Sequence, residues 1–235
     1  MCGDCGCEVA NASHFKKSET KKIHLAENIL QKNKNIAHKN SHWFEDHHIK
    51  AINIMSSPGA GKTALLEKTI SDLSEQINIC TLVGDQQTDN DAQRLKKSGG
   101  MAQQISTHSS CHLDAQMVAD ELGVFVKPEV DLLFIENVGN LVCPSAFDLG
   151  EQIKVALLST TEGEDKPIKY PVLFNKASLI LITKTDLMPY LKWDKDKCVN
   201  YIRQVNSEAK IIFLSSETGE GLDEWYDYLK GELCV

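Results

Sequence analysis

Short apolar runs alternate with amphipathic segments from residue 49 onward, and this alternation constrains the fold more than any other feature of the sequence. Short continuous apolar runs are typical of strands that are buried on both faces, as in a parallel sheet. The amphipathic segments between them suit crossover helices. We therefore expect an α/β fold with a mostly parallel sheet flanked by helices. The predicted strands are 51–55, 79–83, 132–135, 155–158, 179–182 and 211–214, and the predicted helices are 62–75, 112–122, 195–205 and 222–229.

The N-terminal part of the chain has a different pattern. Residues 1–7 form a cysteine-rich tail, and residues 8–48 combine a polar linker, expected to end near residue 18, with a helical segment. In that segment apolar residues recur at near-helical spacing as far as Phe44. Interruptions by Asn, Lys and His leave open whether it is one helix or two. We expect the main domain to span residues 49–235.

The composition excludes several classes of protein. Of the 235 residues, 42% are hydrophobic and 25% are charged, which is usual for a globular protein and not for a disordered chain. The net charge is −8, so we expect no nucleic-acid partner bound by phosphate neutralisation. No apolar stretch approaches the roughly 20 residues that cross a bilayer, and the first residues lack a secretory signal. The sequence therefore predicts a cytoplasmic protein with no membrane partner.

A phosphate-binding loop follows the first predicted strand and precedes a predicted helix, which is the context that such a loop requires. Its glycines let backbone N–H groups approach phosphate oxygens, and the helix N-terminus adds a favourable partial charge. Lys62 would reach the β- and γ-phosphates as a catalytic group, and the Thr63 hydroxyl would bind Mg²⁺. Ser56 replaces the usual first glycine of the motif, at a position that needs a tight turn more than ligand contact. The predicted phosphate-binding residues are Ser57, Gly59, Ala60, Gly61, Lys62 and Thr63.

A guanine-reading sequence, Thr183-Lys184-Thr185-Asp186, follows the fifth predicted strand. The Asp186 carboxylate would accept two hydrogen bonds from guanine, whereas adenine presents acceptors there and is rejected. Lys184 would cover the plane of the base. Thr183 stands where this motif usually has Asn, so we expect a weaker local support. Ser215 and Ser216 follow the last predicted strand, where the third base-contacting loop is expected.

Acidic residues follow two other predicted strands, where the metal and the γ-phosphate would be sensed. Asp85 and Glu136 are candidates for holding Mg²⁺ together with Thr63, directly or through water. Asp85 is also a candidate catalytic residue that orients the attacking water. For the nearby Asp89 and Asp91, capping of the following helix is an equally good interpretation.

Three cysteines in the tail, Cys2, Cys5 and Cys7, are spaced as metal ligands. Thiolates select soft or borderline metals such as Ni²⁺ and Zn²⁺. A structural zinc site would need a second ligand pair downstream, which is absent. The α-amine of Cys2 would provide a fourth donor for Ni²⁺ if Met1 is removed. The alternative is a reduced tail without metal.

A second candidate metal site combines Cys111 and His112 with Cys143. Cys111 and His112 are expected at the start of the predicted helix 112–122, and Cys143 follows the loop after Glu136, which would respond to the γ-phosphate. Each residue alone suits a small buried side chain or a helix start equally well. Together they supply three ligands, so a complete site would add water or a residue from a second subunit.

Six segments of the main domain and the N-terminal CGDCGC resemble the HypB family of hydrogenase nickel-incorporation GTPases. These segments are SSPGAGKT, GDQQTDNDA, CHLDAQM, FIENVGNLVCP, TEGEDKPIKYP and TKTDLMPYL, in this order. The resemblance implies the dimerising SIMIBI class of P-loop GTPases, with slow, regulatory hydrolysis of GTP. The family's long His-rich insert is missing from this sequence, so the resemblance does not extend to nickel storage.

The resemblance also implies metal sites and partners. Cys2, Cys5 and Cys7 would form a high-affinity Ni²⁺ site, and Cys111, His112 and Cys143 a weaker site for Ni²⁺ or Zn²⁺. The implied partners are a second copy of the chain, in a dimer favoured by GTP or metal, a HypA-type zinc and nickel accessory protein, a prolyl isomerase, and the hydrogenase large-subunit precursor.

The expected function is that of a GTP-hydrolysing nickel metallochaperone for [NiFe]-hydrogenase, in which the nucleotide state controls metal release. Three alternatives remain at this point. One is a metal-binding or storage protein with a vestigial nucleotide domain, which the complete lysine, threonine and guanine motifs disfavour. Another is a small-molecule kinase, which would generally lack a base-reading loop of this kind. The third keeps the fold and changes the client to urease or a cobalamin enzyme.

Overall fold

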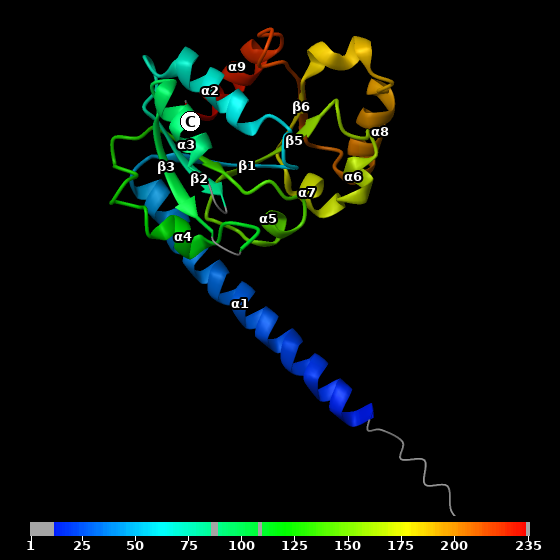
Figure 1. The fold of residues 1–235 in the computed structure, drawn as a ribbon. Helices are drawn as coiled ribbons and strands as arrows, with labels where there is room; N and C mark the ends of the chain where they lie inside the picture. The colour runs from blue at the N-terminus through cyan, green and yellow to red at the C-terminus, as the bar shows by residue number, and fades with distance from the viewer. Residues whose placement is uncertain (1–11, 86–88, 108–109, 234–235) are drawn as a thin grey trace, which may run out of the picture. The chain divides into compact units, whose positions relative to one another are not determined.

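A single sheet of seven parallel strands organises the molecule (Figure 1). The computed structural model describes residues 12–85, 89–107 and 110–233. The strand order is β3-β2-β4-β1-β5-β6-β7, and every neighbouring pair is parallel. The strands are β1 (Lys50–Ser56), β2 (Ile79–Asp85), β3 (Met101–Ser106), β4 (Leu132–Glu136), β5 (Ile153–Ser159), β6 (Leu179–Thr183) and β7 (Lys210–Phe213). The predicted α/β fold is confirmed.

Six of the strands coincide with the predicted apolar runs, and β3 is the exception. β3 lies at the edge of the sheet and pairs with β2 alone. Its sequence, MAQQIS, buries Ala102 and Ile105, while Gln103 and Gln104 are half-buried. An edge strand needs fewer apolar side chains than a central one, so hydrophobicity alone does not reveal it.

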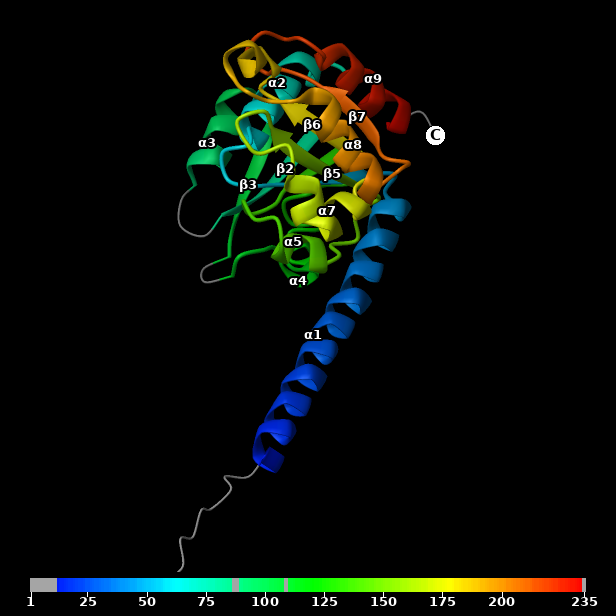
Figure 2. The same cartoon turned by 90° about the vertical axis from the view of Figure 1, so that its right-hand side faces the viewer.

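Three helices cover one face of the sheet (Figure 2): α2 (Lys62–Leu73), α3 (Asn90–Lys97) and α9 (Leu222–Leu233). Ile52 and Ile54 of β1 pack with Leu66 of α2 and Trp225 of α9 in one apolar cluster. The buried Trp225 indole donates a hydrogen bond to the Thr69 hydroxyl at 2.9 Å, so its polar atom is satisfied. This packing fixes α2, whose N-terminus carries the phosphate loop.

The other face is covered by two apolar clusters. Phe44 of α1 and Val118 of α4 pack over one part of the sheet, and Phe174 of α7 with Ile202 of α8 over the other. The helices on this face are the end of α1 (Ala12–Asp46), from residue 33 onward, together with α4 (Ala115–Ala119), α7 (Pro171–Lys176) and α8 (Lys195–Val205). The connections contain three further short elements, α5 (Cys143–Ala146), α6 (Lys166–Lys169) and η1 (Thr185–Tyr190).

The N-terminal helical segment is one helix, α1, and it begins at Ala12. The predicted linker to about residue 18 is therefore too long, because Lys and Glu in that stretch favour helix. The chain divides into two compact units, residues 1–32 and 33–235, so the end of α1 belongs with the sheet. Buried Asn40 of α1 donates to the carbonyl oxygens of Ala115 at 2.8 Å and Leu149 at 3.0 Å.

The predicted helix 112–122 is shorter than expected. α4 begins at Ala115 because the Asp114 side chain accepts a hydrogen bond from the Met117 amide at 2.9 Å and caps the helix. Cys111 and His112 therefore lie in the loop before the helix and not at its start, which corrects the prediction. None of the helices in the described part of the chain is both long and apolar enough to span a membrane.

Candidate nucleotide site and metal cluster

The phosphate loop occupies the turn between β1 and α2. Gly59 has φ +75° and Gly61 has φ +98°, left-handed values that a side chain would strain. A side chain on Gly59 would meet nothing within 4 Å, so its backbone conformation and not crowding requires glycine there. The Ser57 hydroxyl donates to the Glu162 carboxylate, and Ala60 is buried. The loop is thus shaped before any nucleotide arrives.

Lys62 and Thr63 are buried at the start of α2, next to the end of β4. Lys62 donates to the Ser56 hydroxyl at 3.1 Å, so the residue that replaces the usual glycine accepts a hydrogen bond from this lysine. The Thr63 hydroxyl donates to Oε1 of Glu136 at 2.8 Å. Register explains this proximity, because Ile54, two residues before the end of β1, lies opposite Glu136.

Burial shifts the acidities of this pair in opposite directions. It lowers the pKa of Lys62, an effect that the Glu136 carboxylate opposes. It raises the pKa of Glu136 to about 7. Oε2 of Glu136 is buried and has no hydrogen-bond partner among the described residues. A buried carboxylate oxygen without a partner, beside a threonine hydroxyl, fits the ligands that Mg²⁺ prefers.

Two adjoining cavities, of about 580 Å³ and about 770 Å³, both reach the phosphate loop. The smaller one is lined by Lys62, Thr63, Asp85 and Glu136, so the predicted catalytic and magnesium residues share one wall. Cys111 lines the same cavity. The larger cavity is lined by the predicted base-contacting residues Lys184, Asp186, Ser215 and Ser216.

The base-reading loop is held by its own hydrogen bonds. Oδ1 of Asp186 accepts from the Ser215 hydroxyl at 2.5 Å, which fixes the carboxylate. Lys184 has φ +61° and its Nζ donates to the carbonyl of Gly59 at 2.8 Å. The Thr183 hydroxyl donates to the Ala60 carbonyl at 2.7 Å. Thr183 therefore ties this loop to the phosphate loop.

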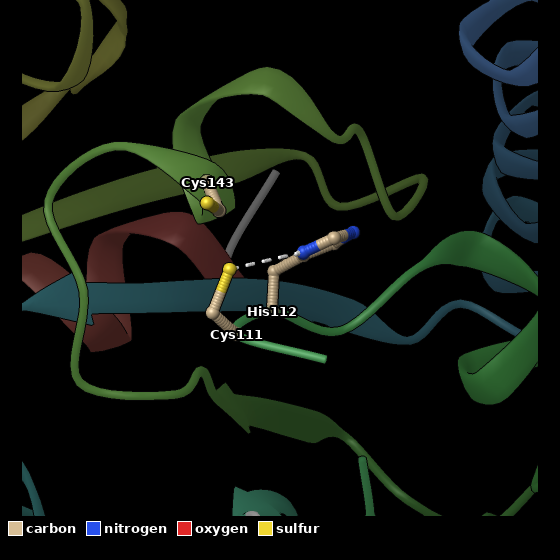
Figure 3. A group of neighbouring side chains, drawn as sticks. All are labelled: Cys111, His112 and Cys143. Atoms are coloured by element: carbon tan, nitrogen blue, oxygen red, sulfur yellow. Dashed lines mark hydrogen bonds between the residues drawn. The ribbon is translucent and has the colours of Figure 1, made fainter. Parts of the chain in front are cut away.

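Cys111, His112 and Cys143 come together although the first and the last are 32 positions apart in the sequence (Figure 3). Their sulfur and ring nitrogen atoms lie within 4.8 Å of one another, and all three residues are half-buried. Nδ1 of His112 is 3.9 Å from the sulfur of Cys111. Among the described residues this is the one group of three or more such side chains with metal-ligand spacing.

The chemistry of the cluster suits a thiophilic metal. Burial lowers the pKa of His112, so the imidazole is neutral near pH 7, as a metal ligand must be. The pKa of Cys111 is raised mainly by two effects: the larger is a hydrogen bond with the Cys143 thiol, and the smaller is burial. The His112 ring stacks on Phe147 with 3.8 Å between ring centroids, which restrains its orientation. Metal binding would have to displace thiol protons.

Several residues near these sites escaped prediction. Glu162 contacts the phosphate loop through Ser57 and pairs with Lys166 at 3.3 Å. Arg94 of α3 pairs with Glu67 of α2 at 2.5 Å and lines both cavities. Their roles depend on tertiary placement, and no local spacing reveals them.

Asp89 and Asp91 support the capping interpretation in part. Asp89 is the N-cap residue of α3 without a side-chain capping bond, and Asp91 lies in the first helical turn and also lines the smaller cavity.

Among the other described cysteines, Cys80 and Cys198 do not join the cluster. Both are buried, and burial raises the pKa of each to about 12, as suits a structural role. The tail residues Cys2, Cys5 and Cys7 lie outside the described residues, as does Cys234.

Comparison with known proteins agrees with this geometry. The family model for the CobW/HypB/UreG nucleotide-binding domain matches residues 50–213. Hydrogenase maturation factor HypB of Escherichia coli K12 is 46% identical over 218 residues, which are 93% of this chain and 75% of that protein.

Solved structures agree as well. HypB from Archaeoglobus fulgidus is 41% identical with a TM-score of 0.81, over 86% of this chain and 99% of that one. HypB from Helicobacter pylori, in complex with nickel, is 35% identical with a TM-score of 0.80, over 86% of this chain and 95% of that one. The signal recognition particle 54 kDa protein of Aeropyrum pernix, in complex with GDP, is 13% identical with a TM-score of 0.54 over 79% of this chain and 47% of that one, and shares the fold alone.

A parallel sheet with a phosphate loop after β1, a buried acidic residue at the end of β4 and a predicted guanine-reading loop after β6 is the arrangement of a P-loop GTPase, and the matching family model assigns the chain to that class. Within that class, the chain belongs to the HypB family of hydrogenase maturation factors. The predicted family and enzyme class are confirmed.

Proposed function

We propose that this chain is a cytoplasmic nickel metallochaperone that inserts Ni²⁺ into the [NiFe]-hydrogenase large-subunit precursor and uses GTP hydrolysis to control release of the metal. One observation carries the proposal: Cys111 of the metal cluster lines the same cavity as Lys62, Thr63 and Glu136. A change at the γ-phosphate is therefore adjacent to a metal ligand.

In the nucleotide half of the proposal, Lys62 stabilises charge on the β- and γ-phosphates and Asp85 orients the attacking water. Thr63, Asp85 and Glu136 would hold Mg²⁺, which would neutralise phosphate charge when bound. The remaining phosphate contacts come from Ser57, Gly59, Ala60 and Gly61. Lys184 and Asp186, with Ser215 and Ser216, select guanine. The burial of Lys62 and Glu136 supports these roles, because charges in a dry site act strongly on phosphate.

In the metal half, nickel is the cargo. Cys2, Cys5 and Cys7 form the high-affinity Ni²⁺ site, and Cys111, His112 and Cys143 form a weaker site for Ni²⁺ or Zn²⁺. Three protein ligands leave a position for water or for a residue of another subunit. A site with an open position releases metal more readily than a closed one, which suits delivery.

The proposed partners follow from this role. A second copy of the chain completes the weaker site in a dimer that GTP or metal favours. A HypA-type accessory protein and a prolyl isomerase assist the transfer, and the hydrogenase large-subunit precursor receives the metal. The net charge of −8 disfavours a nucleic-acid partner.

The test is an anaerobic Ni²⁺ titration that reads thiolate-to-nickel charge-transfer absorbance. It compares the wild type with a triple variant Cys2→Ala, Cys5→Ala, Cys7→Ala and with the variant Cys111→Ala. We expect the triple variant to lose the tight site and Cys111→Ala to lose the weaker one. Nickel binding that is the same in all three proteins would contradict the proposal.

A further inference from the structure

The loop 137–140, between β4 and α5, touches both the phosphate loop and the metal cluster. A side chain on Gly139 would lie 3.0 Å from Cα of Pro58 in the phosphate loop, so the two loops are in backbone contact. On the other side, Nδ2 of Asn140 is 3.5 Å from the carbonyl of Cys111. A displacement of this loop at the phosphate loop would therefore also displace the backbone beside Cys111.

Asn137 makes the firmest of these contacts. It follows Glu136 directly and is 1% exposed. Its Oδ1 accepts hydrogen bonds from the Leu113 amide at 3.2 Å and the Val138 amide at 3.0 Å. Leu113 is the residue after His112, so the bond holds the backbone that presents the imidazole. Leu113 is itself fully buried, so its amide needs a hydrogen-bond partner inside the protein, which Asn137 provides.

A second, indirect path leaves Asn137 through its amide nitrogen. Nδ2 donates to Oδ1 of Asn53 at 3.2 Å, and Nδ2 of Asn53 donates to Glu151 at 2.9 Å. Glu151 then accepts from the Leu149 amide at 2.8 Å. Leu149 lies two residues after Phe147, whose ring stacks on His112. Both paths end beside the same imidazole, and the direct one has a single hydrogen bond.

We propose that Asn137 is a positioning residue that couples nucleotide state to metal affinity: its hydrogen bond to the Leu113 amide moves His112 when the loop 137–140 responds to the γ-phosphate. The inference rests on the proposed function and names the residue through which that regulation acts. Asn137 lines the smaller cavity, but in this assignment it acts through the Leu113 amide and is a ligand of neither the metal nor the phosphates. Its loss should uncouple the two sites without removing a ligand from either.

The experiment uses the full chain with Cys2, Cys5 and Cys7 changed to Ala, so that nickel reports on the cluster alone. Nickel affinity is measured with GDP and with a non-hydrolysable GTP analogue, and the ratio of the two dissociation constants is the coupling factor. Coupling between two sites commonly amounts to about 5- to 150-fold. In this parent protein we expect a factor in that range.

Asn137→Ala and Asn137→Ser should each reduce the factor to below about twofold while nucleotide affinity changes by less than about threefold. Asn137→Ser keeps a polar atom in the buried site, so the prediction can still be tested if the alanine variant fails to fold. Asn53→Ala breaks only the indirect path and should keep the coupling. Asn206→Ala is the matched control, since Oδ1 of Asn206 also accepts from two backbone amides, those of Glu208 at 3.2 Å and Ala209 at 2.9 Å, and Asn206 lines neither cavity.

The outcomes separate the two ideas. A coupled parent whose Asn137 variants are uncoupled supports the inference. A coupled parent whose folded Asn137 variants keep the same factor overturns the inference and leaves the proposed function standing. A parent with equal nickel affinity in both nucleotide states overturns the proposed coupling, and the role of Asn137 falls with it.

Discussion

In the nucleotide pocket the polar side chains hold one another by short hydrogen bonds, whereas the contacts between the members of the metal cluster all involve a thiol. Lys62 is bonded to Ser56, Thr63 to Glu136 and Asp186 to Ser215, at distances from 2.5 to 3.1 Å. In the cluster, the sulfur of Cys111 is 3.9 Å from Nδ1 of His112, and both residues lie in a loop. The pocket is built at strand ends, whereas the cluster is built from the loop before α4 and the first residue of α5.

This difference indicates different roles for the two sites in nucleotide binding and metal release. Ligands of open α/β sheets bind at the carboxyl ends of the strands, where a preorganised site loses little free energy to ordering its side chains. A site whose ligands come from loops changes geometry at a small energetic cost, so its metal affinity can be altered. The predictions below test that division, beginning with the largest expected effect.

Replacing Lys62 with alanine should damage the nucleotide pocket alone. We expect GTP hydrolysis to fall by about 10²- to 10³-fold, because a buried charge on the phosphates is lost. Nickel affinity at the cluster, measured without nucleotide, should stay the same. Lys127→Ala is the control, since Lys127 lines neither cavity and its Nζ donates to the Gly123 carbonyl at 3.0 Å. A parallel loss of nickel binding in Lys62→Ala would show that the two sites are not separable.

Replacing Cys111 with serine should produce the opposite result. Loss of an outer-sphere partner commonly weakens metal binding by about 10- to 100-fold. Loss of a direct ligand should weaken nickel binding at the cluster by at least the upper value, about 100-fold. GTP affinity in metal-free protein should change little. Cys198→Ala, a buried cysteine outside the cluster, should leave nickel binding unchanged. Both variants are titrated with Ni²⁺ in the protein whose tail cysteines are replaced by Ala. An equal loss of nickel affinity in Cys111→Ser and Cys198→Ala would refute the assignment of Cys111 as a ligand.

Asp186→Asn tests whether the pocket reads guanine through a prepared carboxylate. The amide would offer a donor to one position of guanine that also presents a donor, so preference for GTP should fall by about 10²-fold. Xanthosine triphosphate, which has a carbonyl at that position, should gain affinity. Competition binding with the two nucleotides gives the ratio. Unchanged selectivity for GTP would remove Asp186 from the base-reading role.

Nickel binding at the cluster should weaken as pH falls. The pKa of Cys111 is raised, so its thiol holds a proton at neutral pH that the metal must displace. Each displaced proton costs about tenfold in affinity per pH unit. The lowered pKa of His112 keeps the imidazole neutral, so the thiols dominate this dependence near pH 7. A titration series from pH 8 to pH 6 that shows constant affinity would contradict the thiolate assignment.

Thr183→Val should give the smallest effect. The variant loses the 2.7 Å hydrogen bond to the Ala60 carbonyl that joins the base loop to the phosphate loop. A bond of this kind contributes about 1 kcal/mol, so nucleotide affinity should fall by about fivefold. Isothermal calorimetry with GDP measures the change. An unaltered affinity would mean that the two loops are held independently.

The sequence predicted the sheet well because its central strands are continuous apolar runs. Ile52 and Leu133, which face opposite sides of the sheet, are both fully buried, so no polar alternation obscures the pattern. β3 and α3 escaped prediction because one is a half-polar edge strand and the other, NDAQRLKK, is almost entirely polar. Their positions come from pairing and packing with neighbours.

The phosphate loop was predictable in more detail than the metal cluster, because local sequence patterns define the first and tertiary contacts define the second. Local spacing identifies the phosphate loop, because all its parts lie within one turn. The approach of Cys143 to Cys111 depended on topology, and the capping by Asp114 that leaves His112 in a loop was missed. The contacts of Asn137 and of Thr183 with distant backbone are tertiary properties that no local pattern encodes.

The most direct test of the account measures the reciprocal effect, nucleotide affinity as a function of nickel. Dissociation constants for GDP and for a non-hydrolysable GTP analogue are determined in the tail-substituted protein, with the cluster empty and with it saturated by nickel. Linkage requires the metal to change the ratio of the two constants by the factor with which nucleotide changes nickel affinity, in a range of about 5- to 150-fold. The account predicts equal factors in both directions. A ratio that nickel does not alter would contradict the claim that the two sites communicate.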